Sequence, residues 1–113
     1  MRVLVVEDEL LIAMVIETLL ADEGCQVVGP LGRLGAALKA AEDEALDVAL
    51  LDVNIEGAAV FPVADILARR GIPFAFVTGY GSGGVPTAYR DRPVLTKPYR
   101  SREVTDMLKK LCP

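Results

Sequence analysis

Apolar segments of strand length alternate along the chain with segments of helical composition. The apolar segments are rich in β-branched residues and lie at 2–6, 26–29, 47–53, 73–78 and 93–96. The intervening segments contain good helix formers and lie at about 9–22, 33–43, 58–70 and 101–111. Strands and helices that alternate in this way form parallel sheets through right-handed crossovers. The pattern therefore predicts an α/β fold with one parallel sheet and helices on both of its faces.

Residues 79–92, GYGSGGVPTAYRDR, interrupt this alternation. They include four glycines and one proline, and a glycine costs about 1 kcal/mol relative to alanine in a helix interior. We expect a loop here, so that the fourth helix of the predicted series is short or irregular.

The composition indicates one domain that spans residues 1–113. Apolar residues make up 52% of the chain and the mean hydropathy is +0.39, which favours a sheet that is covered on both faces. The net charge of −4 disfavours nucleic-acid binding by this chain. The absence of histidine excludes histidine-ligated metals and histidine general bases. Cys25 and Cys112 are too few for a disulfide framework or a zinc site.

The sequence predicts neither a secretion signal nor a membrane span. The most apolar stretch, LLIAMVI at 10–16, is far too short to cross a bilayer. The N-terminal apolar run ends in acidic residues, which is wrong for a signal peptide. We therefore expect a cytoplasmic protein without membrane contact.

The first apolar segment ends in three consecutive acidic residues, Glu7, Asp8 and Glu9. They repel one another unless a positive charge lies among them. One explanation is that a helix begins here, since acidic side chains are favoured in a first turn. The other is a cation site, because function in an open parallel sheet collects beyond the carboxyl ends of the strands. The residues expected at those ends are Glu7, Asp8, Asp52, Asn54, Thr78, Gly79 and Lys97.

The acidic members of this set suit a divalent cation. Mg²⁺ prefers oxygen ligands in an octahedral array and usually keeps several waters. Asp8, Asp52 and a backbone carbonyl near Asn54 are the candidate ligands, with Glu7 holding a bound water. The sequence thus predicts an Mg²⁺ site.

The other members suit a phosphoryl group. A carboxylate such as Asp52 can attack phosphorus and form an aspartyl phosphate, and the metal offsets the repulsion between attacker and donor. Lys97 supplies a positive charge and Thr78 a short hydroxyl donor. Gly79 allows its backbone N–H to come close to the phosphoryl oxygens.

Four motifs, VVEDE, LLDVN, VTG and LTKPY, together resemble the bacterial response-regulator receiver domain over essentially the whole chain. This resemblance implies a flavodoxin-like sheet of five parallel strands in the order 2-1-3-4-5. It also implies phosphorylation of Asp52 by a histidine kinase or a phosphotransfer protein in a two-component system or phosphorelay. By the same resemblance Glu7 and Asp8 are the acidic pair, Thr78 is the switch hydroxyl and Lys97 is the site lysine.

The chain departs from the usual receiver pattern at the aromatic position three residues before the lysine, where it has Val94. Tyr80 and Tyr99 are the candidate aromatic switch residues instead. With the stretch FVTGYG they are similar to the subgroup named for a Phe-Ala-Thr-Gly-(hydrophobic)-Tyr signature, whose members are often single-domain regulators. We expect a monomer or weak homodimer that is not an enzyme.

Two other functions fit part of the set. The first is an Mg²⁺-dependent phosphohydrolase that uses Asp52 as nucleophile. Such enzymes usually carry a second aspartate two residues later, where this chain has Asn54, which cannot transfer that proton. The second is a nucleotide-binding module, but its glycine-rich loop normally follows the first strand, and Glu7–Glu9 there would repel phosphate. Simpler structural roles also exist: Asp52 and the Lys97–Pro98 pair fit surface turns, and the tyrosines fit packing.

The first predicted helix is apolar on more than one face. A core-facing stripe is expected at i, i+3, i+4, i+7 and i+8, which are Ile12, Val15, Ile16, Leu19 and Leu20. Leu10, Leu11, Ala13 and Met14 then point elsewhere. Leu11 and Met14 are either ordinary exposed residues or a docking patch for the helical domain that carries the donor histidine. We favour the docking patch.

Overall fold

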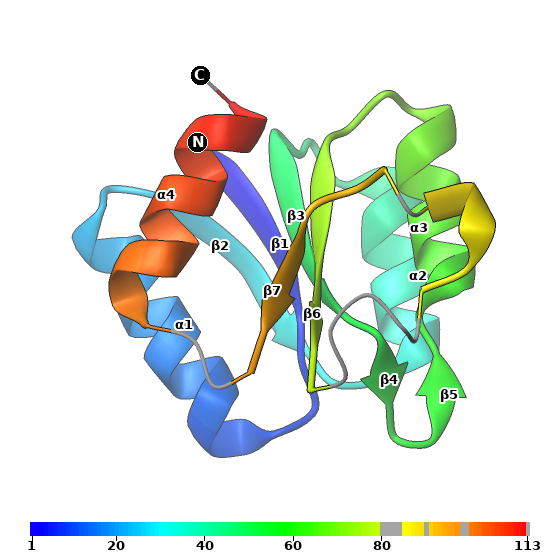
Figure 1. Cartoon of the computed structure of the whole chain (residues 1–113), viewed down its shortest axis with the longest axis horizontal. Helices are drawn as coiled ribbons and strands as arrows, with labels where there is room; N and C mark the ends of the chain where they lie inside the picture. The colour runs from blue at the N-terminus through cyan, green and yellow to red at the C-terminus, as the bar shows by residue number, and fades with distance from the viewer. Residues whose placement is uncertain (80–84, 90, 98–99, 113) are drawn as a thin grey trace.

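Two helical layers enclose a central sheet of five parallel strands (Figure 1). The structure is a computed structural model, and it describes residues 1–79, 85–89, 91–97 and 100–112. The strands run in the order β2-β1-β3-β6-β7. Their bounds are β1 (Arg2–Val6), β2 (Gln26–Leu31), β3 (Val48–Asp52), β6 (Phe74–Thr78) and β7 (Val94–Thr96). The predicted order 2-1-3-4-5 is confirmed, with a small hairpin inserted after β3.

The helices divide evenly between the two faces of the sheet. Helices α1 (Leu10–Asp22) and α4 (Ser101–Leu111) cover one face, and α2 (Leu34–Asp43) and α3 (Phe61–Arg69) cover the other (Figure 1). Side chains alternate along each central strand, so neighbouring residues belong to different cores. In β6, for example, Phe74 and Phe76 face α2 and α3, whereas Ala75 and Val77 face α1 and α4. Both faces are apolar because both are covered.

Strand β2 is longer than the predicted 26–29. Its pairing with β1 shifts register between Leu4 and Val6, where Gly29 and Pro30 form a bulge. A Cβ on Gly29, which has φ +108°, would lie 2.8 Å from the carbonyl oxygen of Val5. Only glycine fits here, and beyond it the carbonyl of Leu31 accepts the N–H of Glu7 at 2.9 Å.

Helix α3 begins three residues later than predicted. Residues 58–60 were expected to be helical, but Ala58–Ala59 forms strand β5 and pairs with β4 (Asn54–Ile55) as an antiparallel hairpin. The turn residues Glu56 and Gly57 have φ of +49° and +80°, which matches the two-residue turn that suits hairpin twist. Hairpin pairing thus overrides the helical composition of this segment.

The predicted core stripe of α1 is partly wrong. Ile16 and Leu20 are buried, and Ile12 and Leu19 pack against the same core. Val15, however, is 60% exposed, whereas Ala13 is 5% exposed. The inward face is therefore rotated by a fraction of a turn toward Ala13.

The described part of residues 79–92 contains one short element of regular structure, the 3₁₀ helix η2 (Thr87–Tyr89). This agrees with the prediction of a loop with no full helix there.

Among the described residues, no helix is both long enough and apolar enough to cross a bilayer.

Candidate functional site

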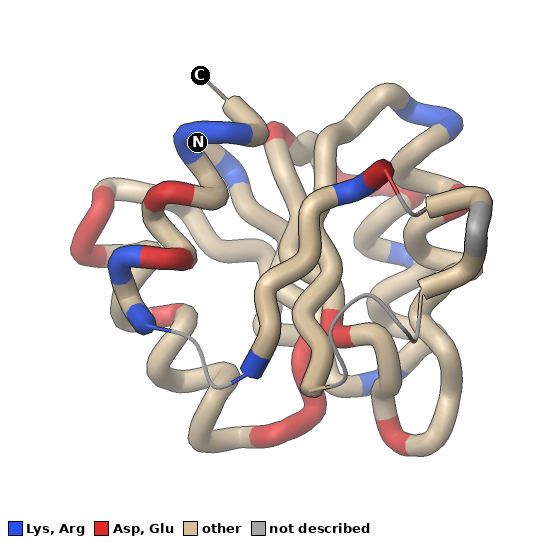
Figure 2. The backbone as a smooth tube through the Cα atoms, in the orientation of Figure 1, with Lys and Arg blue, Asp and Glu red and all other residues tan. Residues whose placement is uncertain are grey.

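The carboxyl ends of the strands bring acidic and basic groups together at one edge of the sheet (Figure 2). Glu7 and Asp8 follow β1, and Asp52 is the last residue of the neighbouring strand β3. Thr78 ends β6, and Lys97 follows β7. Parallel pairing places these residues side by side although they lie far apart in the sequence.

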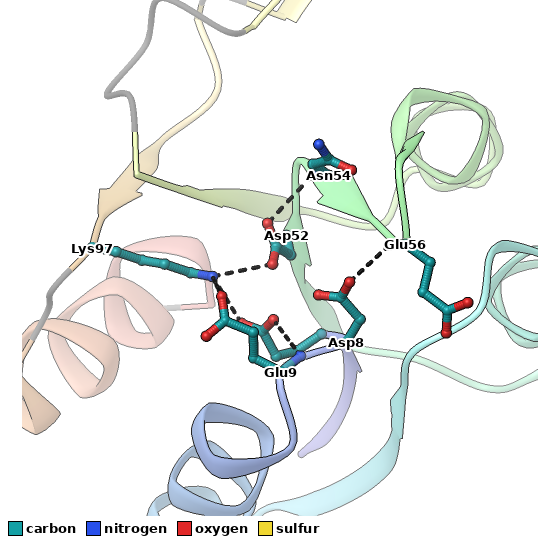
Figure 3. A network of polar contacts seen from close by, with 7 residues as sticks. Asp8, Glu9, Asp52, Asn54, Glu56 and Lys97 are labelled. Carbon is teal, nitrogen blue, oxygen red and sulfur yellow. Dashed lines mark hydrogen bonds and ion pairs between the residues drawn. The ribbon is translucent and has the colours of Figure 1, made fainter.

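Lys97 lies at the centre of a group of carboxylates (Figure 3). Its Nζ is 3.1 Å from Asp52 Oδ2, 3.2 Å from Glu7 Oε1 and 3.7 Å from Glu9 Oε1. The Lys97 side chain is mostly buried. Burial by itself lowers the pKa of Lys97, but the carboxylates of Asp52 and Glu7 outweigh burial and hold the pKa above its ordinary value. Lys97 is therefore a permanently charged ammonium.

Glu7 is a nearly inaccessible carboxylate, with 4% of the residue exposed. Its Oε2 accepts the N–H of Glu9 at 3.1 Å. Its Oε1 is buried without a hydrogen bond of good geometry and has Lys97 Nζ at 3.2 Å as an ionic partner. Burial, followed by the nearby Asp52 carboxylate, raises the pKa of Glu7 to about 7. The pocket thus has more negative charge than one lysine neutralises.

Asp8 and Asp52 are both oriented by backbone N–H groups of the β4–β5 hairpin. The N–H of Glu56 donates to Asp8 Oδ2 at 2.7 Å, and the N–H of Asn54 donates to Asp52 Oδ1 at 3.3 Å (Figure 3). The inserted hairpin therefore holds the two aspartates in place. The role of Asn54 in metal binding remains a prediction.

Glu7, Asp8 and Asp52 fit a divalent cation. One carboxylate oxygen from each lies within 4.8 Å of the others. Three oxygen donors without nitrogen or sulfur are the ligand type of Mg²⁺. Charge is a second indication, because the carboxylates of Glu7 and Asp52 share the single ammonium of Lys97 and the cluster keeps an excess of negative charge that a cation would offset. The donor set and its geometry therefore suit Mg²⁺.

Thr78 and Gly79 lie beside Lys97 on the backbone. Thr78 is 2% exposed, and its carbonyl accepts the N–H of Lys97 at 2.8 Å. Gly79 is exposed, and a Cβ there would meet nothing within 4 Å. The backbone hydrogen bond therefore ties the end of β6 to Lys97.

The predicted aromatic switch residues Tyr80 and Tyr99 lie outside the described residues. Val94, at the usual aromatic position, packs against the core under α2 and α3. A described tyrosine, Tyr89, is half-buried and packs against the same core, where its hydroxyl donates to Asp65 and its ring stacks on Phe61. Burial and the hydrogen bond to Asp65 raise the pKa of Tyr89 to about 12.

Two residues of this network were not among the predicted site residues. The sequence distinguishes Glu9 only as part of the acidic run, and in the structure Glu9 is an ionic partner of Lys97. Glu56 contributes a backbone N–H, which carries no sequence signature beyond the Glu-Gly pair of a tight turn. The acidic run is a usable signal for Glu9, because three adjacent acids require a nearby cation.

Residues 3–109 match the response regulator receiver domain family. The chain belongs to this family. Receiver domains are phosphoacceptor modules of two-component signalling. Membership of this family therefore identifies the chain as such a module. The phosphohydrolase alternative is not favoured.

Solved structures agree with this membership. The chain superposes on the solution structure of SdrG from Sphingomonas melonis Fr1 with a TM-score of 0.87, at 42% identity over 99% of this receiver domain and 96% of SdrG. It superposes on the response regulator PhyR from Brucella abortus with a TM-score of 0.82, at 29% identity over 97% of this chain and 46% of PhyR.

A curated relative gives the same result at lower similarity. The transcriptional regulatory protein PdtaR from Mycobacterium tuberculosis (strain H37Rv) is 26% identical over 108 residues, which are 95% of this chain and 53% of PdtaR. The receiver domain spans about half the length of PdtaR.

Proposed function

We propose that Asp52 is the phosphoacceptor of this receiver domain and that its phosphorylation depends on Mg²⁺. The observation that carries the proposal is the setting of Asp52. It ends a buried central strand, it lies 3.1 Å from the Lys97 ammonium, and it shares a cation-sized pocket with Glu7 and Asp8. A carboxylate in this setting is a nucleophile next to two sources of positive charge.

The reaction is a phosphoryl transfer from a phosphohistidine. A carboxylate oxygen of Asp52 attacks the phosphorus, a P–O bond forms, and the P–N bond to the donor histidine breaks. The electron pair of that bond returns to the imidazole of the donor. Mg²⁺, when bound by Asp8 and Asp52 and through water by Glu7, neutralises charge between the anionic attacker and the anionic donor. Lys97 remains paired with the reacting carboxylate.

Thr78, Gly79 and Lys97 receive the new phosphoryl oxygens. Lys97 offers its ammonium, and the Thr78 hydroxyl and the Gly79 N–H offer hydrogen bonds from the adjacent strand end. Thr78 and Lys97 are coupled through the 2.8 Å hydrogen bond between the carbonyl of one and the N–H of the other. Movement of either residue toward a phosphoryl group is therefore transmitted to the other strand end.

The phosphodonor docks on the outer face of α1. Leu11 and Met14 are 79% and 54% exposed, although exposed helix faces are usually polar. Both line an open groove of about 670 Å³ that also includes Ser101 at the start of α4. Met14 further lines a hollow of about 270 Å³ together with Glu7 and Asp8. This apolar face is thus continuous with the acidic pocket.

The occupant of this groove is the helical domain of a histidine kinase or of a phosphotransfer protein. Such a domain must bring a phosphohistidine to Asp52 across this edge of the sheet. We expect this receiver domain and its phosphodonor to meet in the cytoplasm. An amphipathic helix with an apolar stripe matches the groove in shape and in polarity.

The acceptor assignment is tested by incubation with acetyl phosphate and Mg²⁺, followed by intact-mass measurement. We expect one added phosphoryl group in the wild type and none in Asp52→Asn, and EDTA should abolish the gain. Asp43→Asn is the matched control, because Asp43 ends α2 at the opposite edge of the sheet. Labelling that persists in Asp52→Asn, or that ignores EDTA, contradicts the proposal.

A further inference from the structure

The side chain of Glu9 is not explained by the helix that it begins. Glu9 is the N-cap residue of α1, and its carbonyl accepts the N–H of Ala13 at 2.9 Å, as any residue could. N-cap positions favour Ser, Thr, Asp and Asn, whose short side chains reach the free N–H groups of the first turn. Glu9 makes no such side-chain capping bond. Helix capping therefore does not account for the position of the Glu9 side chain.

That side chain reaches Lys97 instead. Glu9 Oε1 lies 3.7 Å from Lys97 Nζ (Figure 3). The Glu9 side chain is 63% exposed, whereas the side chains of Asp52 and Glu7 are 10% and 2% exposed. Lys97 is thus held between two carboxylates on the floor of the pocket and one on its rim.

We propose that Glu9 is a positioning residue that competes with the phosphoryl group for Lys97. The inference rests on the proposed phosphorylation of Asp52. Before phosphorylation, the Glu9 carboxylate draws the ammonium toward the rim. A phosphoryl group on Asp52 brings new anionic oxygens to the same ammonium, and Lys97 turns away from Glu9. The released carboxylate then faces the phosphoryl group as a like charge.

Removing the charge of Glu9 should therefore favour the phosphorylated state. A solvated ion pair is a small effect, so we expect a change of about 2- to 5-fold rather than loss of function. Glu9→Gln keeps the length of the side chain and leaves helix capping unchanged, because no side-chain cap exists to lose. The neutral amide no longer attracts Lys97 or repels the phosphoryl group.

The test compares wild type, Glu9→Gln and Asp43→Asn at Mg²⁺ concentrations that saturate each protein. Asp43→Asn removes one exposed negative charge at the far edge of the sheet and controls for net charge. Two quantities are measured: the initial rate of labelling by acetyl phosphate and the dissociation constant of beryllofluoride, a stable phosphoryl mimic. Glu9→Gln should raise the rate and lower the dissociation constant by about 2- to 5-fold relative to Asp43→Asn.

A salt series separates charge from structure. In about 1 M salt the Debye length falls to about 3 Å, so the difference between Glu9→Gln and wild type should shrink. Equal values for Glu9→Gln and Asp43→Asn, weaker beryllofluoride binding in Glu9→Gln, or a difference that is insensitive to salt overturns the role of Glu9. Failure of wild-type labelling at Asp52 would instead overturn the proposed function, and the two failures are distinguishable in the same experiment.

Discussion

The negative charge of each acidic residue in the pocket is compensated in a different way. Asp52 pairs with Lys97, and Asp8 accepts a backbone N–H. Glu9 remains largely in water. Glu7 has the least support, since it is buried beside Asp52 and shares Lys97 with it. The protonation of Glu7 is therefore sensitive to the contents of the pocket.

The stability of the metal-free protein should depend on pH through Glu7. Burial raises the pKa of Glu7 from 4.5 to about 7, so the folded protein holds a proton that the unfolded chain has released. The free energy of unfolding should then fall as pH rises from about 5 to about 8. Urea titrations at several pH values measure this slope.

Glu7→Gln supplies the comparison for this slope. The amide does not titrate, so its free energy of unfolding should change less over the same pH interval. Saturating Mg²⁺ should also flatten the wild-type profile, because the metal favours the Glu7 carboxylate. Parallel profiles for wild type and Glu7→Gln without metal would show that Glu7 is ionised throughout.

At the scale of single elements, α1 combines two apolar faces with different purposes. Ala13, Ile16 and Leu20 form the inner face and pack against the sheet. Leu10, Leu11, Met14 and Val15 form an exposed outer face. The outer residues are not stabilised by burial in the core. Their position beside the acidic pocket favours a role in docking of the phosphodonor.

Replacing the outer face of α1 should separate two routes of phosphorylation. The double variant Leu11→Gln/Met14→Gln removes apolar contact without adding charge near the acidic pocket. Transfer from the cognate phosphorylated kinase should slow by about tenfold or more, since loss of one buried apolar side chain costs about 1.5–3 kcal/mol. Acetyl phosphate labelling and the melting temperature should stay near wild-type values.

The matched control for docking is Ala36→Gln, an exposed position on α2 at the other face of the sheet. It should leave transfer from the kinase unchanged. Equal loss of labelling by kinase and by acetyl phosphate in the double variant would place Leu11 and Met14 in the folding core or the reaction site rather than in a docking surface.

At the scale of the whole molecule, the acidic pocket joins elements that are distant in the sequence. Asp8 follows β1, Asp52 ends β3, and the hairpin residue Glu56 contacts Asp8. Lys97 ties β7 to the same group. A cation bound here connects these elements only in the native state, so its binding is coupled to folding.

Mg²⁺ should therefore raise the thermal stability of the protein. A concentration ten times the dissociation constant adds about 1.4 kcal/mol by mass action, which raises the melting temperature by about 6 °C in a domain of this size. Scanning calorimetry with and without Mg²⁺ measures the rise. Asp8→Ala should lose most of it and Asp43→Asn should keep it. A melting temperature that does not respond to Mg²⁺ would argue against a metal pocket.

The sequence is sufficient to predict the order of the main strands and helices and the residues that meet at the carboxyl ends of the strands, but it does not reveal the β4–β5 hairpin. Strand and helix segments differ in composition and in periodicity, and parallel strands all direct their carboxyl ends to one edge. Glu7, Asp8, Asp52 and Lys97 could therefore be grouped from their positions at strand ends alone. The four family motifs also lie at those ends, so resemblance and topology led to the same residues.

Only the folded structure shows how these residues share their charges and which face of α1 is buried. The Lys97 contacts with Glu7, Glu9 and Asp52 depend on side-chain positions and burial contributed by three separate strands and a helix start. A helix that is apolar nearly all round carries no periodic signal for its inner face, so Val15 and Ala13 were misassigned. Likewise, Ala58 and Ala59 pair with the strand before them because the Glu56–Gly57 turn brings the two segments together, and this hairpin pairing outweighs the helical preference of the segment.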